Sequence, residues 1–310
     1  QDALNSSLSR IANLEYLNYK RNENKEIISS LLSDVETYSS SPKLNLYIKQ
    51  TYLDNILRGG YPIIFKTKTS NSVFYLYSRK HGDLERDYNK FQIQPTYFSQ
   101  GNGNYRDVNQ NRRCDIWFNP EIGDENIINF MNLIQADGFN PLVVKGVSYK
   151  IAEPKELERS LAGILDQKDL KNIMSHVGNR IFTPGEIVLF LQESKITPKS
   201  SFSDFINILL SYSAKIQEAE HGEGFWIDHW HYNLDLLENY RALYPEKLAK
   251  LVFDKPVFTF FDNTEIVKPR AAKYIIRNGR VQQLHSVTQD TEKKELIHKR
   301  QEFPHVLRSQ

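Results

Sequence analysis

The densest group of hydrogen-bonding side chains occupies residues 103–113, which read Gly-Asn-Tyr-Arg-Asp-Val-Asn-Gln-Asn-Arg-Arg. Arg106 stands next to Asp107, so a forked donor lies beside a carboxylate acceptor, as the vicinal hydroxyls of a sugar require. No Gly-Lys-Ser/Thr follows the glycines, which excludes a phosphate-cradling loop of that type. A solvated charged face is the competing interpretation. We expect this strip to bind a sugar, and four amide side chains supply paired donors and acceptors: Asn104, Asn109, Gln110 and Asn111.

A second polar group lies in residues 75–89, where basic and acidic side chains alternate. Arg79, His81 and Asp83 are its candidates for binding a substrate, because alternating donors and carboxylates can hydrogen-bond several hydroxyls at once. A solvated loop has the same composition, and the segment alone does not separate the two interpretations.

The third group lies in residues 218–233 and combines aromatic with polar side chains. Trp226 and Trp230 offer flat apolar faces for a pyranose, and Asp228, His229 and Asn233 offer hydrogen bonds. A metal site is an alternative, but the spacing is not that of His-Glu-x-x-His and no distant fourth ligand stands out, so no metal is expected. Aromatic residues packed at the start of a helix are the remaining alternative.

The elements that must position these groups are mainly helical. Apolar spacing predicts helices over residues 3–58, broken at 39–42, and over 124–137 and 233–251. Short β-like runs are expected at 62–65 and 72–77, with long polar loops between the helices. Short apolar segments follow at 257–261 and 274–276, and then a basic, loop-like tail. Residues 150–220 are polar and helical, which indicates an insertion or an outer layer.

Composition limits the classes of partner. The chain has 310 residues and a formal net charge of +2, too small to indicate nucleic acid or a membrane surface. The single cysteine, Cys114, allows no internal disulfide and fits the cytoplasm. A thiol beside Arg113 can be reactive through a lowered pKa, or it can be a small packed side chain.

Taken together, the three groups resemble the cellobiose-phosphorylase-like inverting glycoside phosphorylases, in particular the branch that acts on β-1,3-glucans and laminaridextrins. The run Arg106-Asp-Val-Asn-Gln110 is similar to that family's Arg-Asp-x-x-Gln signature. The blocks 78–87 and 228–235 resemble two others of the β-1,3-glucan branch. The resemblance covers about residues 60–150 and 215–310; each motif is short, but their order is moderately specific.

The resemblance implies a fold and a reaction. The fold is a mainly α catalytic domain, an (α/α)₆ barrel, of which residues 61–310 are the first part and 1–60 a preceding helical segment. By this resemblance, Arg106 and Asp107 hold the glucosyl unit whose bond is cut. Tyr105, Gln110, Arg112 and Arg113 are neighbours that shape or support the same subsite. Inorganic phosphate, the co-substrate, attacks the anomeric carbon with inversion while an acid protonates the departing oxygen. The product is α-glucose 1-phosphate, no cofactor is needed, and the full enzyme is expected to be a homodimer.

One part of the family pattern is missing. The general acid of relatives lies in a Trp-Asn-Asp type of loop, and no such loop occurs before Gln310. We therefore expect a fragment of a longer enzyme, inactive alone, whose catalytic residue is unknown. The alternatives are a sugar-binding module without catalysis, a hydrolase on the same barrel, and a helical interaction scaffold.

Overall fold

The structure is a computed structural model, and it describes residues 8, 10–68, 71–76, 97–101, 103–135, 138, 143–220, 228–283, 287–299 and 305–309. The chain divides into two compact units, residues 1–57 and 58–310. The helices are α2 (Leu14–Ser33), α3 (Pro42–Gly59), α4 (Tyr105–Arg112), α5 (Asp115–Phe118), α6 (Glu125–Met131), α7 (Pro154–Leu161), α8 (Gln167–Val177), α9 (Pro184–Glu193), α10 (Phe202–Ser211), α11 (Asp228–Leu243), α12 (Pro245–Ala249) and α13 (Thr291–Lys299). Shorter helical turns are η2 (Pro120–Ile122), η3 (Lys250–Asp254) and η4 (Arg270–Ala272). The strands are β1 (Tyr61–Lys66), β2 (Asn71–Leu76), β3 (Gly103–Asn104), β4 (Val143–Ile151), β5 (Ile181–Phe182), β6 (Ser213–Glu220), β7 (Thr259–Asn263), β8 (Glu265–Val267), β9 (Tyr274–Arg277), β10 (Arg280–Gln283), β11 (Val287–Gln289) and β12 (His305–Ser309).

The first unit consists of α2 and most of α3, as the apolar spacing predicted. The side chain of Asn13 caps α2 by accepting from the backbone N–H groups of Glu15 and Tyr16 at 2.9 and 3.1 Å. The predicted break is confirmed, because α3 begins at Pro42, where a proline needs no backbone donor. None of the α2 residues is buried, so α2 has no covered apolar face within the described chain.

The second unit is built on the antiparallel strands β4 and β6, which pair from Val143↔Glu220 to Ile151↔Ser213. β3 and β5 pair with β4 as well, which makes a four-stranded sheet. The β4–β6 register shifts between Val144 and Val147. There the Gln100 side chain accepts from Val147 N at 2.7 Å and donates to Val147 O at 2.8 Å.

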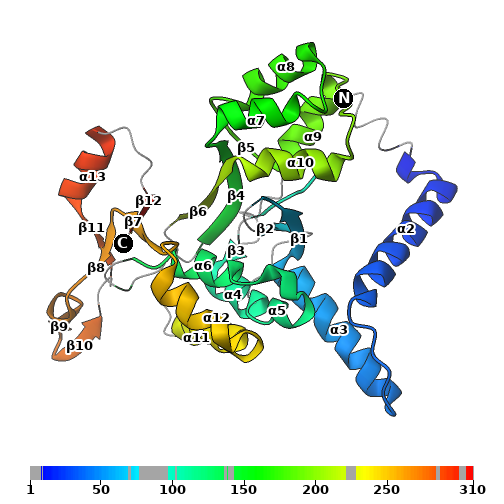
Figure 1. Cartoon of the computed structure of the whole chain (residues 1–310). Helices are drawn as coiled ribbons and strands as arrows, with labels where there is room; N and C mark the ends of the chain where they lie inside the picture. Colours follow the sequence, from blue (N-terminus) through cyan, green and yellow to red (C-terminus); the bar gives the residue numbers. More distant parts are fainter. Residues whose placement is uncertain are drawn as a thin grey trace. The chain divides into compact units, whose positions relative to one another are not determined.

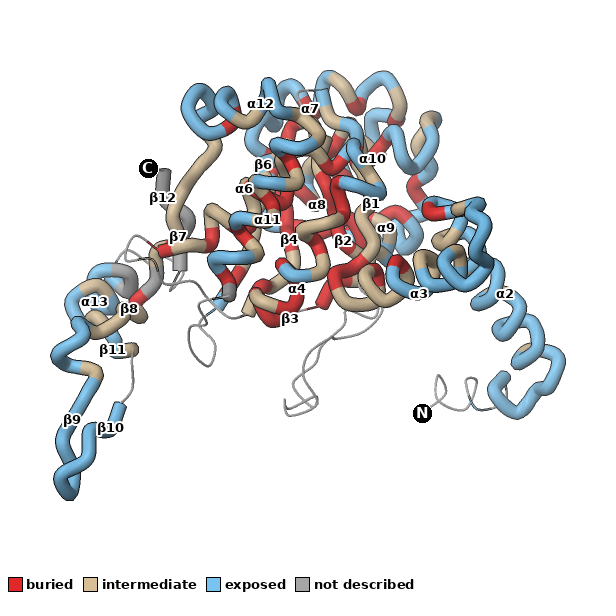
Figure 2. The backbone as a smooth tube through the Cα atoms, turned by 90° about the horizontal axis from the view of Figure 1, so that it is seen from below, coloured by how far each residue is buried: buried red, intermediate tan, exposed pale blue. Residues whose placement is uncertain are grey.

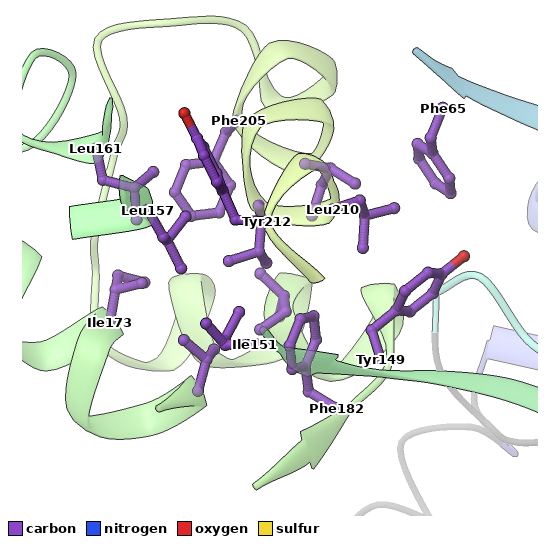
Figure 3. Packing of buried hydrophobic residues seen from close by; sticks show 14 of the residues in the cluster. Phe65, Tyr149, Ile151, Leu157, Leu161, Ile173, Phe182, Phe205, Leu210 and Tyr212 are labelled. Atoms are coloured by element: carbon purple, nitrogen blue, oxygen red, sulfur yellow. The ribbon is translucent and has the colours of Figure 1, made fainter. Parts of the chain in front are cut away.

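A large apolar core lies at one end of β4, under helices α7 to α10 (Figures 1 and 3). Leu157, Leu161 and Phe205 are fully buried in it and pack toward Tyr149 of β4. The side chain and backbone of Thr183 and Glu186 form a capping box at the start of α9. The region 150–220 therefore carries a core of its own, beyond the polar outer layer that its composition suggested.

A second core joins the other end of β4 to helices α4, α6 and α11 (Figure 1). Its fully buried members include Tyr105, Phe130 and Leu133. Val144 of β4 and Ala219 of β6 belong to this core as well. Figure 2 shows the buried residues concentrated along β2 and β4, whereas β9, β10 and α13 are exposed almost throughout.

The expectation of a mainly α chain with short β segments is confirmed, although several boundaries differ. Helix α6 ends at Met131 rather than at residue 137. The predicted helix 233–251 begins earlier and is divided, because Pro245 starts the separate helix α12. Strand β4 was not predicted, and the tail contains a hairpin, β9–β10, followed by α13. Among the described residues, no helix is both long and apolar enough to cross a membrane.

The Leu161→Ala variant tests the α7–α10 core. Leu161 is fully buried, so removing its side chain should lower the free energy of unfolding by about 2–5 kcal/mol. Urea denaturation followed by circular dichroism measures this. The matched control is Leu189→Ala on α9, where the leucine is exposed. This variant should lower the free energy of unfolding by much less. Equal losses in the two variants would contradict this packing.

Candidate functional site

The strip 103–113 folds as helix α4, although its polar sequence predicted a loop. The Asn104 side chain accepts from Arg106 N at 3.1 Å and caps the helix. Asp107 lies in the first turn, where the helix dipole favours negative charge. Tertiary burial overrides the poor helix propensity of the segment, since five of its eight residues are buried: Tyr105, Asp107, Val108, Asn109 and Arg112.

The predicted donor–acceptor pair is present in α4. Arg106 Nε donates to Asp107 Oδ1 at 3.3 Å, and the side chains are 21% and 8% exposed. Asp107 Oδ2 is buried without a hydrogen-bond partner. A buried carboxylate oxygen that lacks a donor is costly, so Asp107 Oδ2 is the atom of this pair whose hydrogen-bonding capacity is unused.

A buried polar network joins α4 to α11 and brings two of the sequence groups together. Asn233 Oδ1 accepts from Tyr105 OH at 3.0 Å and from Asn109 Nδ2 at 2.7 Å. Tyr105 OH also lies 3.0 Å from the Phe130 carbonyl. The rings of Tyr105 and His229 are 5.1 Å apart. Because Tyr105, His229 and Asn233 are all buried, they act here as the support of the strip rather than as an open sugar-binding wall.

Arg113 connects the same two helices nearer the surface. Its Nη1 donates to Asp235 Oδ2 at 2.7 Å, and its guanidinium carbon lies 4.9 Å from the centre of the Tyr232 ring. Asn239 Nδ2 donates to the Arg113 carbonyl at 2.9 Å, and Asn239 Oδ1 accepts from Trp117. Arg113 therefore fixes the orientation of α4 against α11.

The Arg112 side chain is buried and makes its contacts inside the protein. Its Nε donates to the Gly59 carbonyl at 2.6 Å, and its guanidinium lies 3.6 Å from the centre of the Tyr75 ring. Tyr75 OH donates to Asp115 and accepts from Asn126 Nδ2. Burial raises the pKa of Tyr75 well above its ordinary value. No sequence pattern indicates this cluster, because its members are far apart in the chain.

The remaining predicted residues are less connected. Gln110 is exposed on α4, and Trp230 is 43% exposed on α11. Asp228 begins α11, but its side chain lies outside the described residues, as do Arg79, His81, Asp83 and Trp226. The described residues contain no group of three His, Cys, Asp or Glu side chains placed to hold a metal ion.

A small cavity lies beside Arg112 and Tyr75, between β2, β4 and β6. Gln100, Lys215 and Gln217 are among its lining residues, and its volume is about 20 Å³. That volume holds about one water molecule. A sugar ring does not fit in that volume, so this cavity is not a candidate for a sugar-binding site.

Comparisons with known proteins find no matching family model, no similar curated protein and no similar solved structure.

Asn233→Ala tests the buried network. The variant leaves Asn109 Nδ2 without its acceptor, whereas Tyr105 OH keeps the Phe130 carbonyl, so the unfolding free energy should fall by about 1–3 kcal/mol. Chemical denaturation measures the loss. Asn239→Ala, on the same helix but only half-buried, should cost less than about 1 kcal/mol. A larger loss for Asn239→Ala would show that the inner network is not the stabilising one.

The sequence leaves two alternatives for Cys114, a reactive thiol and a small packed side chain. The structure favours the packed side chain. Burial raises its pKa from the ordinary value, and the opposing effect of Arg113 is smaller. A raised pKa reduces the thiolate fraction near neutral pH. At pH 8, Cys114 should thus react more slowly with an aromatic disulfide reagent than free cysteine does, and urea should restore the rate. Faster reaction in the folded protein would contradict this environment.

Proposed function

We propose that this chain supplies the sugar-holding part of an inverting glycoside phosphorylase acting on β-gluco-oligosaccharides. Asp107 carries the proposal, because its buried carboxylate has one oxygen on Arg106 and the other without a donor. Two neighbouring hydroxyls of a glucosyl unit match this pair, one donating to Asp107 and one accepting from Arg106. Hydrogen bonds to charged groups are the stronger ones, which suits a residue that fixes substrate position.

The residues of the proposed site have two roles: some contact the sugar, and others hold helix α4 in position. Arg106 and Asp107 would contact the sugar, while Tyr105, Asn233 and Arg113 hold α4 rigidly against α11 through the bonds already described. A site on a braced helix keeps its geometry better than one on a loop. This arrangement favours a positioning function over a helical scaffold, in which a buried carboxylate with an unpaired oxygen would only cost stability.

The chemistry follows from the resemblance. In the proposed reaction the glycosidic oxygen leaves with a proton from a general acid, and inorganic phosphate forms the new bond at the anomeric carbon from the opposite face. We assign the general acid to no residue of this chain. The (α/α)₆ barrel is likewise part of the proposal, with α4, α6 and α11 contributing to it.

Asp107→Asn tests the binding step in this chain. Replacing the charge with an amide should weaken laminaribiose binding roughly ten- to a hundredfold, since hydrogen bonds to a carboxylate contribute about 1.5–3 kcal/mol. Isothermal titration calorimetry measures the affinity. The melting temperature should stay the same or rise, because the variant removes a buried charge with an unpaired oxygen.

The matched control is Asp254→Asn, an exposed aspartate in η3, which should change neither affinity nor melting temperature. If Asp107→Asn binds laminaribiose like the parent chain, the site is wrong. The reaction is tested separately on a protein that contains this chain within a complete barrel. Glucose 1-phosphate formed only when phosphate is present supports the proposal, and glucose formed without phosphate indicates a hydrolase instead.

A further inference from the structure

A cluster of uncompensated positive charge surrounds the hairpin β9–β10. Between Glu265 and Asp290 the sequence contains no acidic residue. It contains five cationic ones, which are Lys268, Arg270, Lys273, Arg277 and Arg280. None of the five takes part in an ion pair among the described residues. The net charge of +2 is a sum over the whole chain and does not reveal this local excess of positive charge. The expectation of no membrane partner depended on that sum, so it does not apply to this segment.

Two arginines are forced together at the end of the hairpin. Arg277 and Arg280 are directly paired across the strands, and like charges in that position are destabilising. The turn between them has Asn278 and Gly279 at φ values of 53° and 69°. Asn-Gly with both φ values positive is the favoured two-residue hairpin turn. The register is thus fixed by the turn, and the repulsion is relieved when an anion lies between the guanidinium groups.

The other face of the hairpin is apolar and uncovered. Ile276 and Val281 are also paired across the strands, and they are 79% and 69% exposed. Tyr274 shares their face, since side chains two residues apart in a strand point the same way, and it is exposed as well. Figure 2 shows β9 and β10 exposed along their whole length. The end of the hairpin thus has an exposed aliphatic pair on one face and, on the other, two arginines outside any ion pair among the described residues, which indicates a segment that meets another surface.

We propose that the β9–β10 hairpin binds the surface of an anionic phospholipid bilayer. The hairpin enters the surface with its turn first, so Arg277 and Arg280 on one face contact the lipid phosphates. Ile276 and Val281 on the other face enter the boundary between head groups and acyl chains. Long arginine side chains can reach head groups while the neighbouring backbone lies deeper. Apolar burial and attraction to anionic lipid add up in such peripheral binding.

Nucleic acid is the other polyanion that five cations could meet, and the apolar pair decides against it. Phosphate contacts to a nucleic acid use cations and polar groups, which leaves Ile276 and Val281 exposed and unexplained. A bilayer surface accounts for both features at once. The proposal does not depend on sugar binding, since Arg106 and Asp107 are far away in the sequence.

Vesicle sedimentation tests the proposal with the whole chain. The parent chain should bind vesicles of mixed phosphatidylcholine and phosphatidylserine, and should not bind vesicles of phosphatidylcholine alone. Arg277→Gln with Arg280→Gln should lower the partition coefficient roughly thirtyfold, because each cation near an anionic surface contributes a factor of about five. Ile276→Ser with Val281→Ser should lower it by about tenfold, and the loss should remain at high salt.

The matched control is Arg10→Gln with Arg21→Gln, which removes two exposed arginines elsewhere and should leave binding unchanged. Circular dichroism confirms that every variant is folded. Three results would overturn the proposal: equal binding to both vesicles, equal loss in the control, or binding to single-stranded RNA that exceeds vesicle binding and is unaffected by the serine variants.

Discussion

The pairing of β4 with β6 is the constraint on which the second unit depends, because β4 serves two cores at once. Val144 packs with the core of α4, α6 and α11, whereas Tyr149 and Ile151 pack under α7 to α10. A shift of one residue would exchange the faces of the strand and expose both sets. The irregularity between Val144 and Val147 changes the register between the two ends, as bulges do when they re-aim side chains.

The same strand fixes the candidate site. β3 pairs with β4 through Gly103↔Val144, and Asn104, the next residue, caps α4. Gly146 lies opposite Gln100, whose amide satisfies both backbone groups of Val147. A side chain at Gly146 would lie within 2.7 Å of that amide, so only glycine permits this approach. The position of Asp107 therefore follows from sheet pairing as much as from its own helix.

Sequence periodicity predicted the elements whose apolar residues repeat, such as α2, α3 and α11, and it missed those whose burial is unusual. Helix α4 was predicted as a loop because its buried residues include Asp107 and Asn109, which no apolar pattern identifies. Strand β4 was not predicted, because Lys145 and Gly146 interrupt the alternation of apolar and polar residues along it. The sequence interpretation assigned residues 103–113 and 218–233 to sugar binding, but it did not predict that Asn233 of the second group is buried.

The unpaired atoms around α4 are of two kinds, and the difference singles out Asp107. Asn109 Oδ1 and Asn233 Nδ2 both lack a partner, but they are an acceptor and a donor on amides already joined by one bond of 2.7 Å. A small rotation would make the pair reciprocal, so the helices can satisfy these atoms themselves. For Asp107 Oδ2 no hydrogen bond is found among the described residues, and a buried charge costs more than a buried amide. This cost is why the proposed sugar contact is placed on the carboxylate of Asp107 rather than on the two amides.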